Sequence, residues 1–178
     1  MAVRDDRSDV KQTTTGFRGP LMVQSLTSAK SKFLSLDLCH EIDLVQWLAG
    51  PYQSMTALGG KVSNLEIDSD DVFALLLELQ NCPIATLTMN YLDTVLSREL
   101  IAHTDRGTLR ANIALKTFSD GAGEEKFSAE PDDTYIAQLT AFLSDDQDTL
   151  CSLSEGLSVN KVIAAAETAS AKRTWLKA

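Results

Sequence analysis

The sequence predicts an α+β fold, in which a mostly antiparallel open sheet carries helices packed on one face. Two observations predict it. Helical periodicity is confined to residues 34–50 and to two segments near the C-terminus, whereas residues 52–113 alternate apolar and polar side chains as strands do. A doubly wound parallel sheet would instead alternate strands with helices along the chain. We therefore expect one antiparallel run of strands with helices at its two ends.

The N-terminal segment is the part of the chain least suited to packing. Residues 1–16 are polar, charged and rich in Thr, Asp and Arg, so we expect a mobile arm there. Residues 17–178 are expected to form a single domain, since a chain of 178 residues is of ordinary domain size and long enough to bury a core. A first short strand is expected over residues 21–26.

The strongest helix signal in the first half lies in residues 34–50 and contains one of the two histidines. Gly50 and Pro51 stop this helix. Asp37 precedes His40 by three residues, which places a carboxylate near an imidazole at one end of the helix. One face should pack on a larger surface, because its apolar side chains recur at helical spacing; they are Leu34, Leu38, Ile42, Val45 and Ala49.

Turn residues divide the alternating region into hairpins. The turns are Asn81-Cys82-Pro83 and Asp105-Arg106-Gly107. Two further helices, over 133–144 and 154–175, close the chain. The expected strands cover residues 52–62, 72–80, 84–92, 98–104, 108–113, 115–118 and 125–127, the last two as an edge hairpin.

Composition excludes several classes of partner. A formal net charge of −9 leaves no surplus of Lys and Arg to neutralise a phosphate backbone, so we expect no nucleic acid partner. No apolar run approaches the roughly 20 residues that cross a bilayer, and the N-terminus lacks the apolar core of a secretory signal. Three widely spaced cysteines, Cys39, Cys82 and Cys151, indicate free thiols in a reducing compartment. We therefore expect a cytoplasmic protein with no membrane partner.

One stretch resembles a known family. Residues 37–43 read Asp-Leu-Cys-His-Glu-Ile-Asp, and Trp-Leu-Ala-Gly follows over 47–50. This is similar to the motif that opens the C-terminal domain in the Gfo/Idh/MocA family of glucose-fructose oxidoreductases and inositol dehydrogenases. Gly107-Thr108-Leu109 resembles a turn between the central strands of the same domain. The resemblance implies that His40 and Asp37 contact the sugar or polyol, with His40 donating or accepting the proton of the hydroxyl being oxidised.

The resemblance covers residues 34–176 and is to one domain of an enzyme. No G-x-G-x-x-G fingerprint follows a strand, so we expect no cofactor in this chain, whereas the full-length family implies NAD or NADP in an N-terminal Rossmann domain. We interpret the chain as a truncated, substrate-binding and oligomerisation domain of an NAD(P)-dependent sugar or polyol oxidoreductase. It is expected to be inactive until a separate dinucleotide-binding domain is supplied. Whether the chain is an enzyme by itself stays open.

An alternative function is a non-catalytic dimeric scaffold or binding module that retained the fold. In the resembled family the open face of this sheet often packs against the same face of another subunit, which implies a homodimer. The corresponding face here mixes apolar and polar side chains, namely Leu76, Ile84, Leu92 and Leu100 with Thr86, Thr88 and Asn90. A solvent-exposed face with scattered apolar side chains is the other interpretation.

Each candidate side chain also has a structural interpretation. From spacing alone, His40 is more often a packed helix histidine bonded to Asp37 or Asp43 than an acid or base. Asp37 is equally an ordinary first-turn acid, and Asp43 is more often structural. His103 is expected to be a hydrogen-bonded histidine of the sheet. No metal site is expected, and a solvated acidic loop is favoured over a cation site for Glu66, Asp68, Asp70 and Asp71, because the EF-hand spacing is missing.

Overall fold

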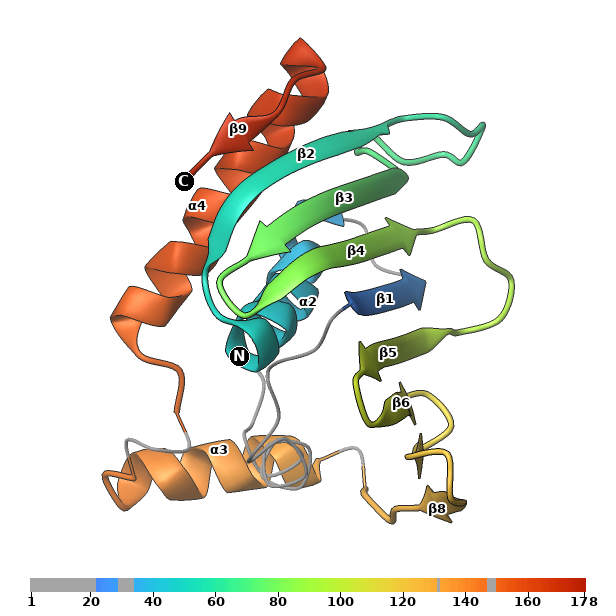
Figure 1. Cartoon of the computed structure of the whole chain (residues 1–178), viewed down its shortest axis with the longest axis vertical. Coiled ribbons are helices and arrows are strands. Elements are labelled where there is room, and N and C mark those ends of the chain that lie inside the picture. The colour runs from blue at the N-terminus through green and yellow to red at the C-terminus, as the bar shows by residue number, and fades with distance from the viewer. Residues whose placement is uncertain (1–21, 29–33, 131, 147–149) are drawn as a thin grey trace.

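A computed structural model describes residues 22–28, 34–130, 132–146 and 150–178 (Figure 1). The arm expected over residues 1–16 lies outside the described residues. The helices are α2 (Leu34–Ala49), α3 (Asp133–Leu143) and α4 (Leu153–Lys172). The strands are β1 (Met22–Ser28), β2 (Tyr52–Gly60), β3 (Val72–Leu79), β4 (Cys82–Asn90), β5 (Arg98–Thr104), β6 (Gly107–Asn112), β7 (Thr117–Ser119), β8 (Glu124–Lys126) and β9 (Leu176–Lys177).

All described strands belong to one open sheet, in the order β8-β7-β6-β5-β1-β4-β3-β2-β9. Neighbouring strands are antiparallel except β1 and β4, which run parallel. The predicted α+β class with a mostly antiparallel open sheet is therefore confirmed. The expected edge hairpin is also present, as β7 and β8.

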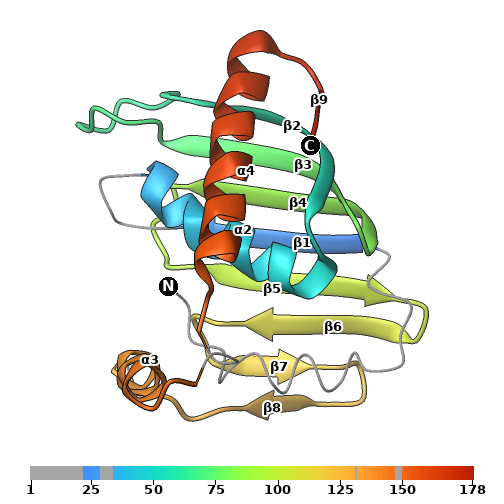
Figure 2. The same cartoon turned by 90° about the vertical axis from the view of Figure 1, so that its left-hand side faces the viewer.

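Helices α2 and α4 lie on the same face of this sheet (Figure 2). The strand residues that point toward them are apolar at every second position, as the period of a strand requires. Burying each such side chain contributes about 1.5–3 kcal/mol. The most buried strand residues on this face are Val23, Met55, Phe73, Leu75, Leu77, Leu79, Ala85, Leu87 and Met89.

Local signals in the sequence fix the ends of the two covering helices. Gly50 has a φ of 81° and donates its N–H to the Gln46 carbonyl at 2.8 Å, so it ends α2 as predicted. The N-cap of α4 is Ser152, whose hydroxyl accepts from the Glu155 N–H at 3.2 Å. The Glu155 carboxylate in turn accepts from the Ser152 N–H at 2.7 Å, which completes a capping box.

Three features of the sheet differ from the expectations. Strand β1 lies between β5 and β4 and runs parallel to β4, whereas one antiparallel run of strands was expected. Leu100 was assigned to the mixed open face, and this is wrong: it is 7% exposed and pairs with Ser25 on the helix-covered face. A short C-terminal strand, β9, was not predicted and extends the sheet beyond β2.

Helix α3 stands apart from α2 and α4, at the end of the molecule that carries β8 (Figures 1 and 2). Its only buried residue is Ala141. The apolar side of this helix, which includes Leu139 and Phe142, is exposed.

No helix in the described ranges is both long enough and apolar enough to cross a membrane.

Candidate functional site

The two residues expected to contact substrate both lie in α2. His40 is half-buried, and Asp37 precedes it by one helical turn. The side chain of Asp37 is outside the described part of the structure, so the expected pairing of the two groups stays a prediction. Asp43, on the following turn, is half-buried as well. The helix therefore carries the histidine along the covered face of the sheet.

A buried carboxylate next to His40 fixes the position of α2. Glu41 is 3% exposed, and its Oε1 accepts a hydrogen bond from Arg98 Nε at 2.8 Å. Its Oε2 accepts from Ser25 Oγ at 3.1 Å. These contacts join the helix to β5 and β1, and burial protects them from screening by solvent. Because consecutive helical residues differ by about 100°, holding Glu41 also sets the direction of His40.

A second hydroxyl lies on β1 beside this carboxylate cluster. Thr27 is 9% exposed and is the register partner of Arg98 across β1 and β5. Within the described residues its Oγ1 is buried and has no hydrogen-bond partner. Buried hydroxyls are normally bonded, so Thr27 is an exception among the polar groups of this cluster. Ser25, Thr27 and Arg98 thus present polar groups toward the side of the sheet that α2 covers.

Glu41, Arg98 and Ser25 were missed by sequence reasoning. The ion pair joins residues 57 positions apart, and no local pattern indicates such a contact. The available signal was the pair of hydroxyl residues, Ser25 and Thr27, which share the inward side of β1 with Val23. Inward polar residues of this kind need partners once they are buried.

The acidic loop before β3 ends at Asp71, and this residue is packed inside the protein rather than solvated. Asp71 is fully buried, and the solvated interpretation is wrong for this side chain. Its carboxylate accepts from the Val62 N–H at 2.7 Å, from the Ser63 N–H at 3.0 Å, from the Ser63 hydroxyl and from Lys61 Nζ at 3.2 Å. Burial acts to raise the pKa of Asp71, but these donors outweigh it and hold the pKa well below its ordinary value.

The second histidine has a structural place. His103 lies on β5, on the face opposite to the helices, and its Nδ1 is 3.2 Å from Thr108 Oγ1 on β6. The interpretation as a hydrogen-bonded sheet histidine is confirmed. Among the described residues, no group of His, Cys, Asp or Glu is arranged to hold a metal ion.

The connections into the helices bear on where a dinucleotide can bind. The segments that lead into α2, α3 and α4 are residues 29–33, 127–132 and 144–152, and none contains a glycine. A dinucleotide pyrophosphate needs glycines at such a strand-to-helix turn, so that the backbone can approach it closely. The sequences of these three segments therefore do not fit the pyrophosphate of a dinucleotide.

The fold and the polar cluster under α2 define the chain as a helix-covered sheet domain with a histidine held on its first described helix. The family model for the GFO/IDH/MocA C-terminal domain matches residues 16–110, which is more than half of the chain. The chain belongs to this family. The comparison with curated proteins gives no match.

Solved structures with the same fold include several dehydrogenases. Levoglucosan dehydrogenase, in a complex with NADH, has a TM-score of 0.77 at 14% identity, and the match covers 94% of this chain and 60% of that one. The WlbA dehydrogenase from Bordetella pertussis, in complex with NADH and UDP-GlcNAcA, has a TM-score of 0.75 at 15% identity and 99% and 62% coverage. UDP-N-acetylglucosamine 3-dehydrogenase GnnA from Acidithiobacillus ferrooxidans has a TM-score of 0.74 at 19% identity, and the match covers 94% of this chain and 59% of that one. The chain spans about three-fifths of the length of these structures.

Proposed function

We propose that this chain is the substrate-binding and oligomerisation domain of an NAD(P)-dependent sugar or polyol oxidoreductase, and that it acts with a separate dinucleotide-binding domain. One observation carries the proposal. His40, from the motif that resembles the family's substrate-contacting pair, lies on a helix fixed to the sheet by the buried Glu41 contacts. A general acid or base needs such a fixed position, because proton transfer depends on hydrogen-bond distance.

The chemistry assigned to this chain is proton transfer and orientation. The unperturbed pKa of an imidazole lies near the pH of the cell, so His40 can take a proton from a substrate hydroxyl and return it. Asp37, one turn earlier, orients the ring and the sugar. The nicotinamide, when bound in the other domain, accepts the hydride.

The test is isothermal titration of the purified chain with a panel of sugars and polyols and with NAD(H) and NADP(H). We expect at least one sugar or polyol to bind and neither dinucleotide to bind. His40→Ala should abolish the sugar signal, whereas His103→Ala, which changes the other histidine on the opposite face of the sheet, should retain it. Binding that survives His40→Ala unchanged would contradict the proposal.

The open face of the sheet supports the oligomerisation part of the proposal. The large apolar side chains that remain on this face are Leu26, Leu58, Leu76 and Ile84, which are 38–58% exposed. They alternate with Thr86, Thr88 and Gln24 across adjacent strands. A two-fold dimer buries one such face against itself, because each copy offers the same mixture of apolar and polar groups. The proposed partner on this face is a second copy of the chain.

The mass of the chain in solution tests this dimer. We expect twice the chain mass, and a single-chain mass for Ile84→Asp, since a carboxylate would be buried at the centre of the interface. Val95→Asp is the matched control, because Val95 is 74% exposed in the loop between β4 and β5. A wild-type chain that stays monomeric at high concentration would contradict the dimer.

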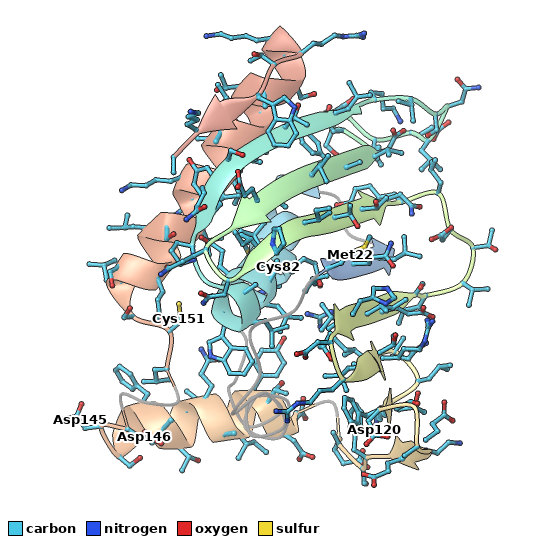
Figure 3. All side chains as sticks on the ribbon, in the orientation of Figure 1. Met22, Cys82, Asp120, Asp145, Asp146 and Cys151 are labelled. Atoms are coloured by element: carbon cyan, nitrogen blue, oxygen red, sulfur yellow. The ribbon has the colours of Figure 1, made fainter. Side chains whose placement is uncertain are left out.

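We also place the protein in the cytoplasm. No disulfide joins the three described cysteines, Cys39, Cys82 and Cys151, which agrees with a reducing compartment. Cys82 is the first residue of β4, and Cys151 precedes α4 (Figure 3). Burial raises the pKa of the Cys82 thiol, so this group is a poor nucleophile.

A further inference from the structure

Helix α3 exposes an unusual amount of apolar surface for an isolated surface helix. Five large side chains, which we call the α3 stripe, are each at least 60% exposed: Tyr135, Ile136, Leu139, Phe142 and Leu143. Single exposed apolar residues need no explanation, but a contiguous group of this kind marks an interaction surface.

The α3 stripe is a single face that points away from the rest of the molecule. At 100° per residue its five members fall within an arc of about 120° of the helix circumference. Ala141, the one buried residue of α3, lies on the opposite side of the helix from this arc. The helix therefore turns a small residue toward the molecule and its large apolar residues outward. This is the reverse of the arrangement that covers a domain's own core.

The isolated position of α3 requires further support for the helix. It has 11 residues, and helices of this length are marginal in water unless one face packs against another surface. Neither α2 nor α4 supplies that surface, because both cover the strands β2 to β4. The apolar face that would gain most from packing is the α3 stripe.

Charge decides between a second copy of this chain and a different partner. Exposed acids flank the α3 stripe at both ends, Asp132 and Asp133 before it and Asp145 and Asp146 after it. Figure 3 shows Asp145 and Asp146 at the end of α3 farthest from β8. Two copies that packed these helices against each other would bring the carboxylates at the two ends of the stripe together. The surface instead suits an apolar groove with a basic rim.

The comparisons indicate which domain would carry such a groove. Each match to a solved relative covers 94–99% of this chain but only 58–62% of the relative's chain. Several of them were solved with NADH or NAD+. We propose that the α3 stripe docks the dinucleotide-binding domain, in a groove lined by apolar residues and edged by Lys or Arg. This inference rests on the proposed function in that both require such a domain.

A fusion tests the docking. The segment of levoglucosan dehydrogenase that precedes its matched part is joined ahead of this full chain, because a tether raises the local concentration of a weakly matched partner. Binding of NADH, measured by its fluorescence, identifies the fusions in which the levoglucosan dehydrogenase segment is folded. The readout is hydrogen exchange at the backbone amides of residues 135–143, compared with the unfused chain. The disruptive variant is Leu139→Asp with Phe142→Asp, and the matched control is Val95→Asp, which changes an exposed valine in the loop between β4 and β5.

We expect these amides to exchange at least about tenfold more slowly in the fusion, because docking protects α3 from local opening. The double variant should return the rate to that of the unfused chain, and Val95→Asp should not. Unchanged exchange in an NADH-binding fusion would overturn the proposal. So would protection that appears in the unfused chain as its concentration rises, since that would assign the stripe to a second copy. Sugar binding at His40 is measured on the unfused chain, so its failure is distinguishable from a failure of docking.

Discussion

Asp71 illustrates how one residue controls a loop. Its buried carboxylate collects donors from Lys61, Val62 and Ser63 and so closes the connection between β2 and β3. A buried carboxylate is tolerated only when its oxygens are bonded in this way. The acidic composition of the segment predicts a loop, but it does not distinguish the buried acid from its exposed neighbours, such as Asp70.

The low pKa of Asp71 makes folding stability depend on acidity. The folded-state pKa lies below the unfolded value of about 3.9, so the folded protein favours the charged form more than the unfolded chain does. This contribution is present above the unfolded pKa and is lost as the pH falls toward the folded one. We expect the melting temperature of Asp71→Asn to be lower than wild type at pH 7, with the difference shrinking below pH 4. Asp70→Asn is the control. A difference that is constant from pH 7 to pH 3 would contradict this account.

At the scale of the element, α2 is held by a polar contact as well as by apolar packing. Removing Arg98 leaves the buried Glu41 carboxylate with Ser25 as its remaining donor among the described residues, and a lost hydrogen bond to a charged group costs about 1.5–3 kcal/mol. The side chain of Arg98 is one-third exposed, which lowers the expected value toward 1 kcal/mol.

We expect Arg98→Met to lower the free energy of unfolding by about 1–2 kcal/mol, measured by urea denaturation. The double variant Glu41→Leu with Arg98→Met should be at least as stable as the single one, because it removes the unpaired buried charge. If the two single changes instead add in the double variant, the two side chains are not coupled.

Strand β2 passes so close to β3 and α4 at Gly59 that this position requires a glycine. A Cβ at Gly59 would overlap the ring of Phe73, and the Gly59 N–H donates to Ser170 Oγ on α4 at 3.0 Å. Gly59→Ala should therefore lower the free energy of unfolding by about 1–3 kcal/mol through overpacking. Gly123→Ala, where a Cβ would meet nothing within 4 Å, should have little effect. Equal thermal stability of the two variants would show that Phe73 moves aside at no cost.

The elements also show where sequence patterns stop being informative. Alternation predicts the core face of β3 and β4 correctly, because a strand buried on one face has a period of two. It misplaces Leu100, because a shift of one residue moves every side chain of a strand to the other face, and the pairing of β5 with β1 sets that register. For α3 the periodicity predicts the helix but not what covers its apolar face.

For the molecule as a whole, the class of fold follows from the order of the elements, and the order of the strands does not. The parallel pairing of β1 with β4 joins residues 22–28 to residues 84–90, and no local signal encodes such a contact. The candidate site likewise has residues that the sequence reveals and contacts that it does not. His40 and Asp37 are recognisable from their motif, whereas the ion pair that fixes their helix forms only when β5 reaches α2.

The most direct measurement of the central claim uses the fact that the chain has only two histidines. The ring protons of His40 and His103 give two resonances in a proton NMR spectrum, and the variant His103→Ala assigns them. We predict that a sugar or polyol shifts the His40 resonance, while the resonance of His103, bonded to Thr108 on the opposite face, stays unchanged. A ligand that binds without moving the His40 resonance would contradict the assignment of this histidine to the substrate site.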